Sequence, residues 1–282
     1  MGSHLAEYLL ASGHRVDVID DLSGGKKENV PKEATFFFAR CQDWMPYERD
    51  YDFCYHLAST VGVSRVTDDP TKTILNIVDS TRKVLALGCK GIYFSTSEVY
   101  GKNTGVLDET SDCLISPKAR WNYAAAKLCG EWMALQAGWK VVRLFNVIGP
   151  RQNLLYGAVF PNFISQAIEN KPITVYGDGK QVRTFIDVRD CVEILDMLRD
   201  REFDVVNVGG LMKMTVLQLA EAIRMAVNSE SEIRFVDYPM GSGFEECRRR
   251  VADLNKLYSL IGRFKYRSFE DTVSICQPNL TT

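Results

Sequence analysis

Helix-like and strand-like patterns alternate through the first half of this 282-residue chain, and this alternation restricts the fold more than any other feature. Residues 3–13 form an amphipathic helical pattern, and helical patterns also cover roughly residues 71–88 and 120–136. The runs with strand character are RVDVID, TFFFA, YDFCYHLA, GIYFSTS and KVVRLFN. Strands that alternate with helices are typical of βαβ units, because parallel neighbours need a crossover connection. The pattern predicts an α/β fold built on a parallel sheet.

The second half, from residue 146 onward, is richer in loops but keeps both patterns. DVRDCVEILDMLRD is helical and DVVNVGG is strand-like, and a further helix begins at Thr215, which is a good capping residue. The sequence contains no internal repeat, no low-complexity tract and no clear linker. We therefore expect two lobes that interleave along the chain.

The composition argues against several functional classes. A formal net charge of −2 gives no electrostatic basis for binding nucleic acid or an anionic membrane. No apolar run approaches the ~20 residues that span a bilayer, and the first residues lack the cationic lead of a signal peptide. The eight cysteines are scattered without CxxC spacing, so we expect no metal site and no disulfide framework. A cytoplasmic protein is the simplest interpretation.

Tyr123 and Lys127 stand four residues apart on a predicted helix, with only alanines between them. Residues at this spacing share one helix face. A phenol has a pKa of ~10 and is a poor base, but a nearby ammonium favours its phenolate form. The pair is therefore a candidate proton-transfer device, although a Tyr–Lys pair on a helix surface would give the same pattern.

A second candidate lies at the end of a predicted buried strand, where hydroxyl groups and a carboxylate follow one another. The residues are Thr96, Ser97 and Glu98. In open α/β sheets the carboxyl ends of the strands form the ligand crevice. These side chains are thus placed to face the same ligand as Tyr123, although an ordinary strand end would also fit.

Together these motifs resemble those of the extended short-chain dehydrogenase/reductase family, in the branch that modifies nucleotide sugars. The resemblance covers almost the whole chain. Within this branch the motifs look most like those of UDP-glucuronate decarboxylases, because simple 4-epimerases usually lack the Ser–Glu pair after the threonine. The segments that carry it are VIDDLSGG, HLAS, STSEVYG, YAAAK, RLFNVIGPRQ, VYGDGKQVRTFIDVRD and GFEECRRRVADLNKLYSLIG.

The resemblance implies a fold and a set of partners. The fold is a Rossmann-type doubly wound parallel sheet with a smaller α/β substrate-binding lobe. Residues 1–145 with 184–209 would bind NAD, and residues 146–183 with 210–282 would bind the nucleotide sugar. The expected substrate is a UDP-sugar. A homodimer is also expected, because relatives commonly pair through the helix of Tyr123 and the helix before it.

The resemblance also implies roles for individual residues. Tyr123 would take the proton of the sugar C4 hydroxyl, with Lys127 lowering the pKa of the tyrosine and binding the nicotinamide ribose. The catalytic set is completed by Thr96, Ser97 and Glu98. The cofactor-binding set is Gly2, Asp20, Leu57, Ala58, Asn76, Tyr123 and Lys127. The substrate-binding set is Asn146, Tyr176, Arg183 and Arg250, in which Arg250 would hold a carboxylate.

Two departures from the family pattern stand out. Family members open with a strand and a glycine-rich turn, whereas here Met1 directly precedes the last of those glycines, Gly2. The absent strand would be central, so its neighbours should be left with unpaired edges, and a fragment or a misassigned start is the expected explanation. The second departure is Arg40, which stands where relatives often have an aspartate near the adenine. Asp20 still favours NAD, because it would repel the 2′-phosphate of NADP.

Several functions remain open at this stage. Decarboxylation of UDP-glucuronate is narrowly ahead of 4-epimerisation of a UDP-hexose, and dehydration to a 4-keto-6-deoxy sugar is third. The different-class alternative is a non-catalytic relative that only binds a nucleotide sugar or a partner. The absent glycine turn favours that alternative, and the intact set of Thr96, Tyr123 and Lys127 opposes it.

Overall fold

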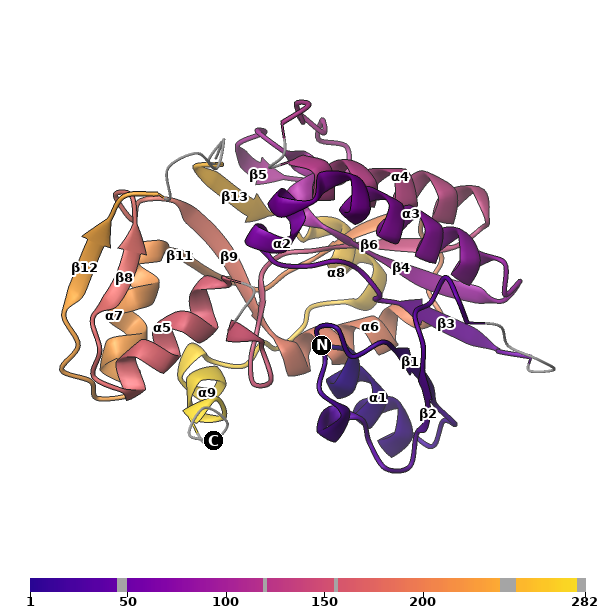
Figure 1. The fold of residues 1–282 in the computed structure, drawn as a ribbon, viewed down its shortest axis with the longest axis horizontal. Coiled ribbons are helices and arrows are strands. Elements are labelled where there is room, and N and C mark those ends of the chain that lie inside the picture. Colours follow the sequence, from indigo (N-terminus) through magenta and orange to yellow (C-terminus); the bar gives the residue numbers. More distant parts are fainter. Residues whose placement is uncertain (45–49, 119–120, 155–156, 239–246, 278–282) are drawn as a thin grey trace.

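The computed structural model describes residues 1–44, 50–118, 121–154, 157–238 and 247–277 (Figure 1). A parallel sheet occupies the middle of the molecule. Its strand order is β10 (Val205–Val208), β6 (Lys140–Leu144), β4 (Lys90–Thr96) and β3 (Phe53–His56). Among the described residues, no helix is both long enough and apolar enough to cross a bilayer.

Helices cover both faces of this sheet, which is why its strands read as continuous apolar runs. On one face α3 (Pro70–Leu85) and α4 (Asn122–Gln136) pack side by side. The other face carries α1 (Gly2–Ala11), α6 (Val188–Arg199) and α8 (Asn255–Ile261), whose apolar side chains join those of the strands in one core. The layered arrangement agrees with the predicted α/β fold.

A separate pair of parallel strands lies beside the sheet. It consists of β1 (Asp17–Asp20) and β2 (Thr35–Phe38), and the loop between them contains the short helix η1 (Lys27–Asn29). No backbone hydrogen bond between described residues joins β1 to β3; instead a cavity of about 2200 Å³ runs along both strands.

The second lobe contains a mixed sheet with the order β11 (Met212–Thr215), β9 (Val182–Asp187), β13 (Arg249–Ala252) and β5 (Gly105–Leu107). The remaining strands are β7 (Val147–Ile148), which pairs with β9, and the parallel pair β8 (Ile173–Tyr176) and β12 (Ile233–Val236). The helices α5 (Val159–Ile168), α7 (Val216–Ala226) and α9 (Phe269–Ser274) share one apolar core with these strands. Thr215 caps α7 in a reciprocal capping box, as predicted.

The two lobes exchange chain segments. Strand β5, from the first half of the sequence, lies beside β13 in the second sheet, while α8, from the last part, packs under the first sheet. The short helices α2 (Val63–Asp68) and η2 (Ser97–Tyr100) complete the elements. The lobe boundaries predicted from the sequence stay a prediction.

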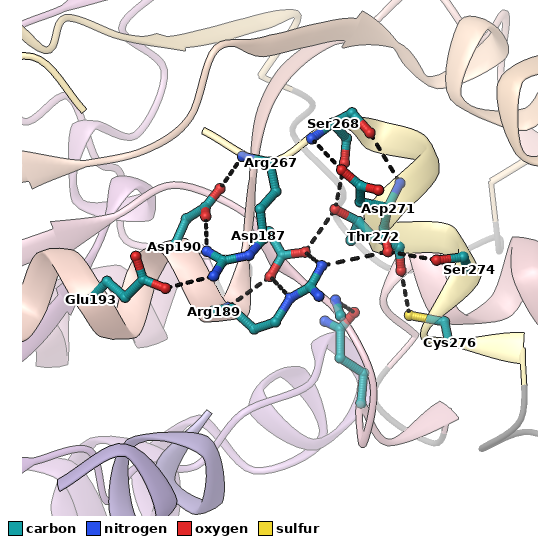
Figure 2. A network of polar contacts seen from close by, with 12 residues as sticks. Asp187, Arg189, Asp190, Glu193, Arg267, Ser268, Asp271, Thr272, Ser274 and Cys276 are labelled. Carbon is teal, nitrogen blue, oxygen red and sulfur yellow. Dashed lines mark hydrogen bonds and ion pairs between the residues drawn. The ribbon is translucent and has the colours of Figure 1, made fainter. Parts of the chain in front are cut away.

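A polar network fastens α9 to the start of α6 (Figure 2). The fully buried carboxylate of Asp187 caps α6, accepts two hydrogen bonds from the Arg189 guanidinium and accepts the Thr272 hydroxyl at 2.8 Å. Arg267 bonds both Asp190 and Glu193 on α6. Buried carboxylates need such partners, so this network fixes the last described helix against the fold.

Candidate active site

Helix α4 carries the predicted proton-transfer pair, and Lys127 is buried on its inner face with 2% of its surface exposed. The ammonium donates a hydrogen bond of 2.8 Å to the carbonyl oxygen of Phe94 on β4 and lies 4.9 Å from the centre of the Tyr93 ring. A buried ammonium must be paired with acceptors. Lys127 is therefore held in one position rather than lying on the helix surface.

Tyr123 lines a small cavity of about 230 Å³ at the carboxyl end of β4. Its hydroxyl is hydrogen-bonded to the hydroxyls of Ser59 and Thr96. The Thr96 oxygen also accepts the backbone N–H of Glu98 at 3.2 Å, which fixes the direction of the Thr96 side chain. The cavity is also lined by Ser97, Glu98 and Asn146.

The protonation of the pair differs from the prediction. The pKa of Tyr123 is raised, first by burial and then by the Glu98 carboxylate, whereas the sequence argument expected Lys127 to lower it. Burial lowers the pKa of Lys127 to about 7, although the Glu131 carboxylate opposes this shift. In this structure the ammonium bonds a backbone carbonyl rather than the phenol, so the predicted lowering is wrong for this state. Both groups can exchange a proton once a ligand changes their surroundings.

Two features that the sequence did not reveal hold α4 in register. Gly130 lies so close to the Tyr93 ring and hydroxyl that a β-carbon there would collide with both. One residue later, the buried Glu131 carboxylate accepts hydrogen bonds from Nε and Nη2 of Arg143 on β6, at 3.0 and 2.7 Å, and one from Ser95 on β4. These contacts set the height of Tyr123 above the sheet.

Five of the seven predicted cofactor residues line the large cavity, whereas Tyr123 and Lys127 do not. The residues that line it include Gly2, Asp20, Leu57, Ala58 and Asn76. Asp20 ends β1 and accepts the backbone N–H of Leu22 at 2.7 Å, and a β-carbon on Gly25 would lie only 3.4 Å from its carboxylate. Burial raises the pKa of Asp20. The carboxylate is therefore placed to accept a ribose hydroxyl, as in other dinucleotide-binding sheets.

The start of α1 also suits a dinucleotide. The side chain of its N-cap residue, Met1, accepts no hydrogen bond from the first backbone N–H groups of the helix. Such groups, together with the helix dipole, favour an anion. The residues present thus fit NAD, and it stays a prediction that Gly2 would hold its diphosphate and Asp20 its ribose.

Arg40, the second departure, lies on the wall of the same cavity after β2. Its guanidinium donates to the Asn76 side-chain oxygen at 3.2 Å and lies 3.7 Å from the Asp43 carboxylate. At this position of the cavity wall, Arg40 offers hydrogen-bond donors, where the family pattern often has the acceptor oxygens of an aspartate.

The predicted substrate residues are only partly brought together. Arg250 is 2% exposed and forms an ion pair with Glu98, so it reaches the edge of the small cavity through that carboxylate. Its backbone pairs with that of Arg183, on the neighbouring strand β9. Tyr176 is 45% exposed and stacks on Tyr238 with ring centres 6.0 Å apart. Neither Tyr176 nor Arg183 is among the described residues that line the two cavities.

Sequence reasoning missed some residues of the site. Ser59 lines the large cavity and bonds Tyr123, and Met1 lines both cavities, so the two adjoin there. Ser59 could have been found, because it ends the HLAS segment that carried the resemblance. The described residues contain no group of three or more His, Cys, Asp or Glu side chains arranged to hold a metal ion.

Comparison with known proteins decides the family. A model described as the NAD dependent epimerase/dehydratase family matches residues 1–209. The chain belongs to this family. The predicted family is thereby confirmed, and NAD is the cofactor of this epimerase/dehydratase family, as predicted.

Among curated members, a UDP-N-acetyl-alpha-D-glucosaminuronate decarboxylase of Bacillus cytotoxicus is 33% identical, over 91% of this chain and 87% of its own. UDP-glucuronic acid decarboxylase 4 of Arabidopsis thaliana is 31% identical over 93% of this chain. The chain spans only 62% of the length of that plant relative.

Solved structures agree on the fold. The UDP-glucose 4-epimerase of Thermotoga maritima, solved with UDP-glucose, is 25% identical with a TM-score of 0.86, and the match covers 99% of this chain and 94% of that one. The predicted parallel-sheet, Rossmann-type α/β fold is thus confirmed.

Proposed function

We propose that the protein is an NAD-dependent decarboxylase of UDP-glucuronate that works through a 4-keto intermediate. The observation that carries this proposal is the ion pair between the buried Arg250 and the partly exposed Glu98, beside the cavity of Tyr123 and Thr96. An ion pair of this kind is costly to bury and needs a functional or structural reason. A guanidinium paired with a carboxylate of the cavity wall suits a substrate carboxylate that takes the place of that partner.

Tyr123 and Thr96 would act first, at the C4 hydroxyl of the sugar. The Thr96 hydroxyl orients the substrate hydroxyl, and the Tyr123 oxygen takes its proton as the C4–H bond breaks. When bound, NAD supplies the hydride acceptor and later returns the same hydride, so that none is consumed. The resulting ketone lies β to the C6 carboxylate.

Decarboxylation follows from that ketone. The C5–C6 bond breaks, CO₂ leaves, and the electron pair moves into the C4 carbonyl to give an enolate, which C5 protonation converts back to a ketone. Arg250 would hold the carboxylate before this step, and Glu98 would balance the charge of Arg250 afterwards. Nε of Arg250 has no hydrogen-bond partner within the described part of the chain, so the guanidinium keeps a donor for a further acceptor. Return of the hydride and of the tyrosine proton completes the cycle.

Two alternatives have specific support. The relative from Bacillus cytotoxicus is named for a substrate with an N-acetyl group, so UDP-N-acetylglucosaminuronate is the second candidate substrate. The likeness to a UDP-glucose 4-epimerase makes C4 epimerisation the second candidate reaction. Both would use the same Tyr123 and Thr96 contacts.

Incubation with four nucleotide sugars tests the proposal. The sugars are UDP-glucuronate, UDP-N-acetylglucosaminuronate, UDP-glucose and UDP-N-acetylglucosamine, with products identified by mass and NMR. Release of CO₂ and a UDP-pentose from UDP-glucuronate is the expected result. Conversion of the neutral sugars alone would reject decarboxylation, and CO₂ from the N-acetyl uronate alone would reassign the substrate.

We also propose that the protein is a homodimer that pairs through the outer faces of α3 and α4. Trp132 on α4 is 63% exposed and Leu75 on α3 is 54% exposed, which are large apolar surfaces for packed neighbouring helices. A dimer mass by light scattering is expected, and Trp132→Glu should shift it to the monomer mass. A monomeric parent protein would refute this assignment.

We place the protein in the cytoplasm and divide it into the two lobes predicted from the sequence. All eight cysteines are free thiols in the structure. Separate apolar cores under the two sheets support the two lobes. Limited proteolysis in the presence and absence of UDP-glucuronate would map the boundary between them.

A further inference from the structure

One polar side chain interrupts the apolar strand β10. The other three residues of this strand are valines, and Asn207 among them is fully buried. Asparagine is depleted in strands, and a buried amide costs stability unless its donors and its acceptor are bonded. A fourth valine would continue the apolar run. The amide therefore has a task beyond the formation of the sheet.

The side chain of Asn207 joins three segments that are far apart in the sequence. Its Oδ1 accepts the Tyr100 hydroxyl at 2.7 Å. Its Nδ2 donates to the carbonyl oxygens of Leu107 and Asp253, at 2.9 and 3.4 Å. The backbone N–H of Asp253 also donates to the Leu107 carbonyl oxygen, at 2.9 Å. A single amide thus ties together the end of η2, the end of β5 and the residue that follows β13.

These segments carry both partners of the ion pair beside the small cavity. Glu98 lies on η2, two residues before Tyr100, and Arg250 lies on β13, three residues before Asp253. Strand β13 is also held by β5, with which it pairs in parallel (Figure 1). The end of η2 contacts the guanidinium a second time, because Nη2 of Arg250 donates to the Gly101 carbonyl oxygen at 3.5 Å. The position of η2 relative to β13 therefore sets how the guanidinium is held.

Tyr100 and Asn207 reach the site only through these segments. Neither residue is among the described residues that line the two cavities. The Tyr100 ring packs with Val99 and Phe145 in a small apolar core, and its hydroxyl also bonds the Arg143 side chain. The packed ring would stay in place without its hydroxyl. Removal of the hydroxyl would therefore cut the link to Asn207 while leaving the core filled.

We propose that Asn207 and Tyr100 are positioning residues that set the approach of Glu98 to Arg250, and with it the preference of the site for a sugar that carries a carboxylate. This inference rests on the proposed function, because it assigns the substrate carboxylate to Arg250. Bidentate recognition of a carboxylate depends on the orientation of the guanidinium plane. Fixed ends of η2 and β13 keep that orientation when the substrate carboxylate takes the place of Glu98.

The test compares the binding of UDP-glucuronate and UDP-glucose, which differ only in the group at C6. Calorimetric titrations with saturating NAD use the Tyr123→Phe variant as the reference protein, so that neither sugar is consumed. Into this reference, Tyr100→Phe removes the hydroxyl and keeps the ring, and Asn207→Leu replaces the amide with an apolar group of similar shape. Tyr258→Phe is the matched control, because it removes a tyrosine hydroxyl that bonds Tyr266 at 3.4 Å under the first sheet.

The measured quantity is the Kd for UDP-glucose divided by the Kd for UDP-glucuronate. We expect Tyr100→Phe and Asn207→Leu each to lower this ratio about three- to tenfold, which corresponds to the loss of one hydrogen bond, with the Kd for UDP-glucose nearly unchanged. The double variant should lower the ratio no further than one substitution does, because both break the same bond. Tyr258→Phe should keep the ratio of the reference protein.

Several outcomes would overturn the proposal. They are a reference protein that does not prefer UDP-glucuronate, an unchanged ratio in Tyr100→Phe, and weaker binding shared equally by both sugars, which is the mark of a purely structural role. An unchanged ratio in a folded Asn207→Leu protein would remove Asn207 from the assignment; if that variant does not fold, Tyr100→Phe alone decides.

Decarboxylation is judged separately, by CO₂ release from the parent protein. A ratio that falls as expected without CO₂ release would reject the proposed reaction and keep the positioning role. CO₂ release together with an unchanged ratio would do the reverse. The two failures are therefore distinguishable.

Discussion

The reactivity of Tyr123 is set by three hydroxyl or carboxylate neighbours rather than by its position on a helix. Ser59 and Thr96 bond its hydroxyl, and the Glu98 charge raises its pKa. A tyrosine in these surroundings keeps its proton until bound ligands alter the balance.

Replacing Tyr123 with phenylalanine should remove the proton acceptor while leaving the shape of the cavity unchanged. General acid–base groups contribute about 10²- to 10⁴-fold, so turnover of UDP-glucuronate should fall at least 100-fold. The amount of NAD released from the denatured protein should match the parent. Tyr258→Phe, on α8 outside both cavities, is the control and should keep full activity. Activity retained by Tyr123→Phe would assign the proton transfer to another group.

Arg250 should discriminate acidic from neutral sugars. Arg250→Ala removes the carboxylate partner, so kcat/KM for UDP-glucuronate should fall at least tenfold more than any activity with UDP-glucose. Arg248→Ala, on an exposed neighbour that bonds Asp178, is the matched control and should change both activities little. Equal losses with the two sugars would contradict a carboxylate-holding role.

Among the site residues, the sequence predicted best those that belong to short motifs. Thr96, Tyr123 and Lys127 were predicted from short motifs, and the structure gathers Thr96 and Tyr123 at one cavity with Lys127 buried on the same helix. Ser59 and the partners of Glu131 depend on packing between distant segments, which no short motif encodes. The predicted direction of the Tyr123 pKa shift was wrong for the same reason. Burial and the Glu98 carboxylate raise this pKa, while the Lys127 ammonium bonds the Phe94 carbonyl oxygen instead of the phenol.

Among the contacts that hold α4 on the sheet, one is a buried ion pair. The ion pair of Glu131 with Arg143 ties it to β6, and both side chains are almost fully buried. Arg143→Leu would leave the Glu131 carboxylate uncompensated, which costs about 3–5 kcal/mol in the free energy of unfolding. Urea titration measures this loss, and Arg234→Leu, whose partner Glu232 is exposed, should cost no more than ~1 kcal/mol. A loss similar to that of the surface control would mean that packing alone holds the helix.

Element boundaries followed the sequence closely where turn and cap signals exist. The helix expected at roughly 71–88 is α3 (Pro70–Leu85), with proline in its first turn and the Asp69 side chain as its cap. Strand pairing was not predictable in the same way. Strands β5 and β13 pair with each other although they are far apart in the sequence. Hydrophobic periodicity indicates which residues form strands but not which strands become neighbours.

For the whole molecule, acid stability should depend on a histidine in the core. His56 is 2% exposed and bonds the Thr81 hydroxyl at 3.1 Å, and burial lowers the pKa of His56 to about 3. Unfolding restores a pKa of ~6.5, so between these values the unfolded chain binds one more proton than the folded chain. The free energy of unfolding should therefore fall as the pH falls, with a contribution of about 2 kcal/mol between pH 7.5 and 5.

A pair of variants isolates this contribution. His56→Gln keeps a hydrogen-bonding group opposite Thr81 but cannot be protonated, so its stability should lose that part of the pH dependence. His14→Gln changes an exposed histidine and should leave the profile of the parent protein. Urea titrations at pH 7.5, 6.5, 5.5 and 5 provide the comparison. Parallel profiles for the parent and His56→Gln would show that other groups govern acid unfolding.

The pairing of β5 with β13 also has a consequence for how the protein is made. Ribosomes add ~5–20 residues per second, so on the order of 10 s separate the emergence of Gly105 from that of Arg250. During this interval a nascent strand waits outside the exit tunnel without its neighbour. Chaperones that shield exposed strand edges should therefore raise the yield of this enzyme, and synthesis that stalls before residue 250 should leave an aggregating product.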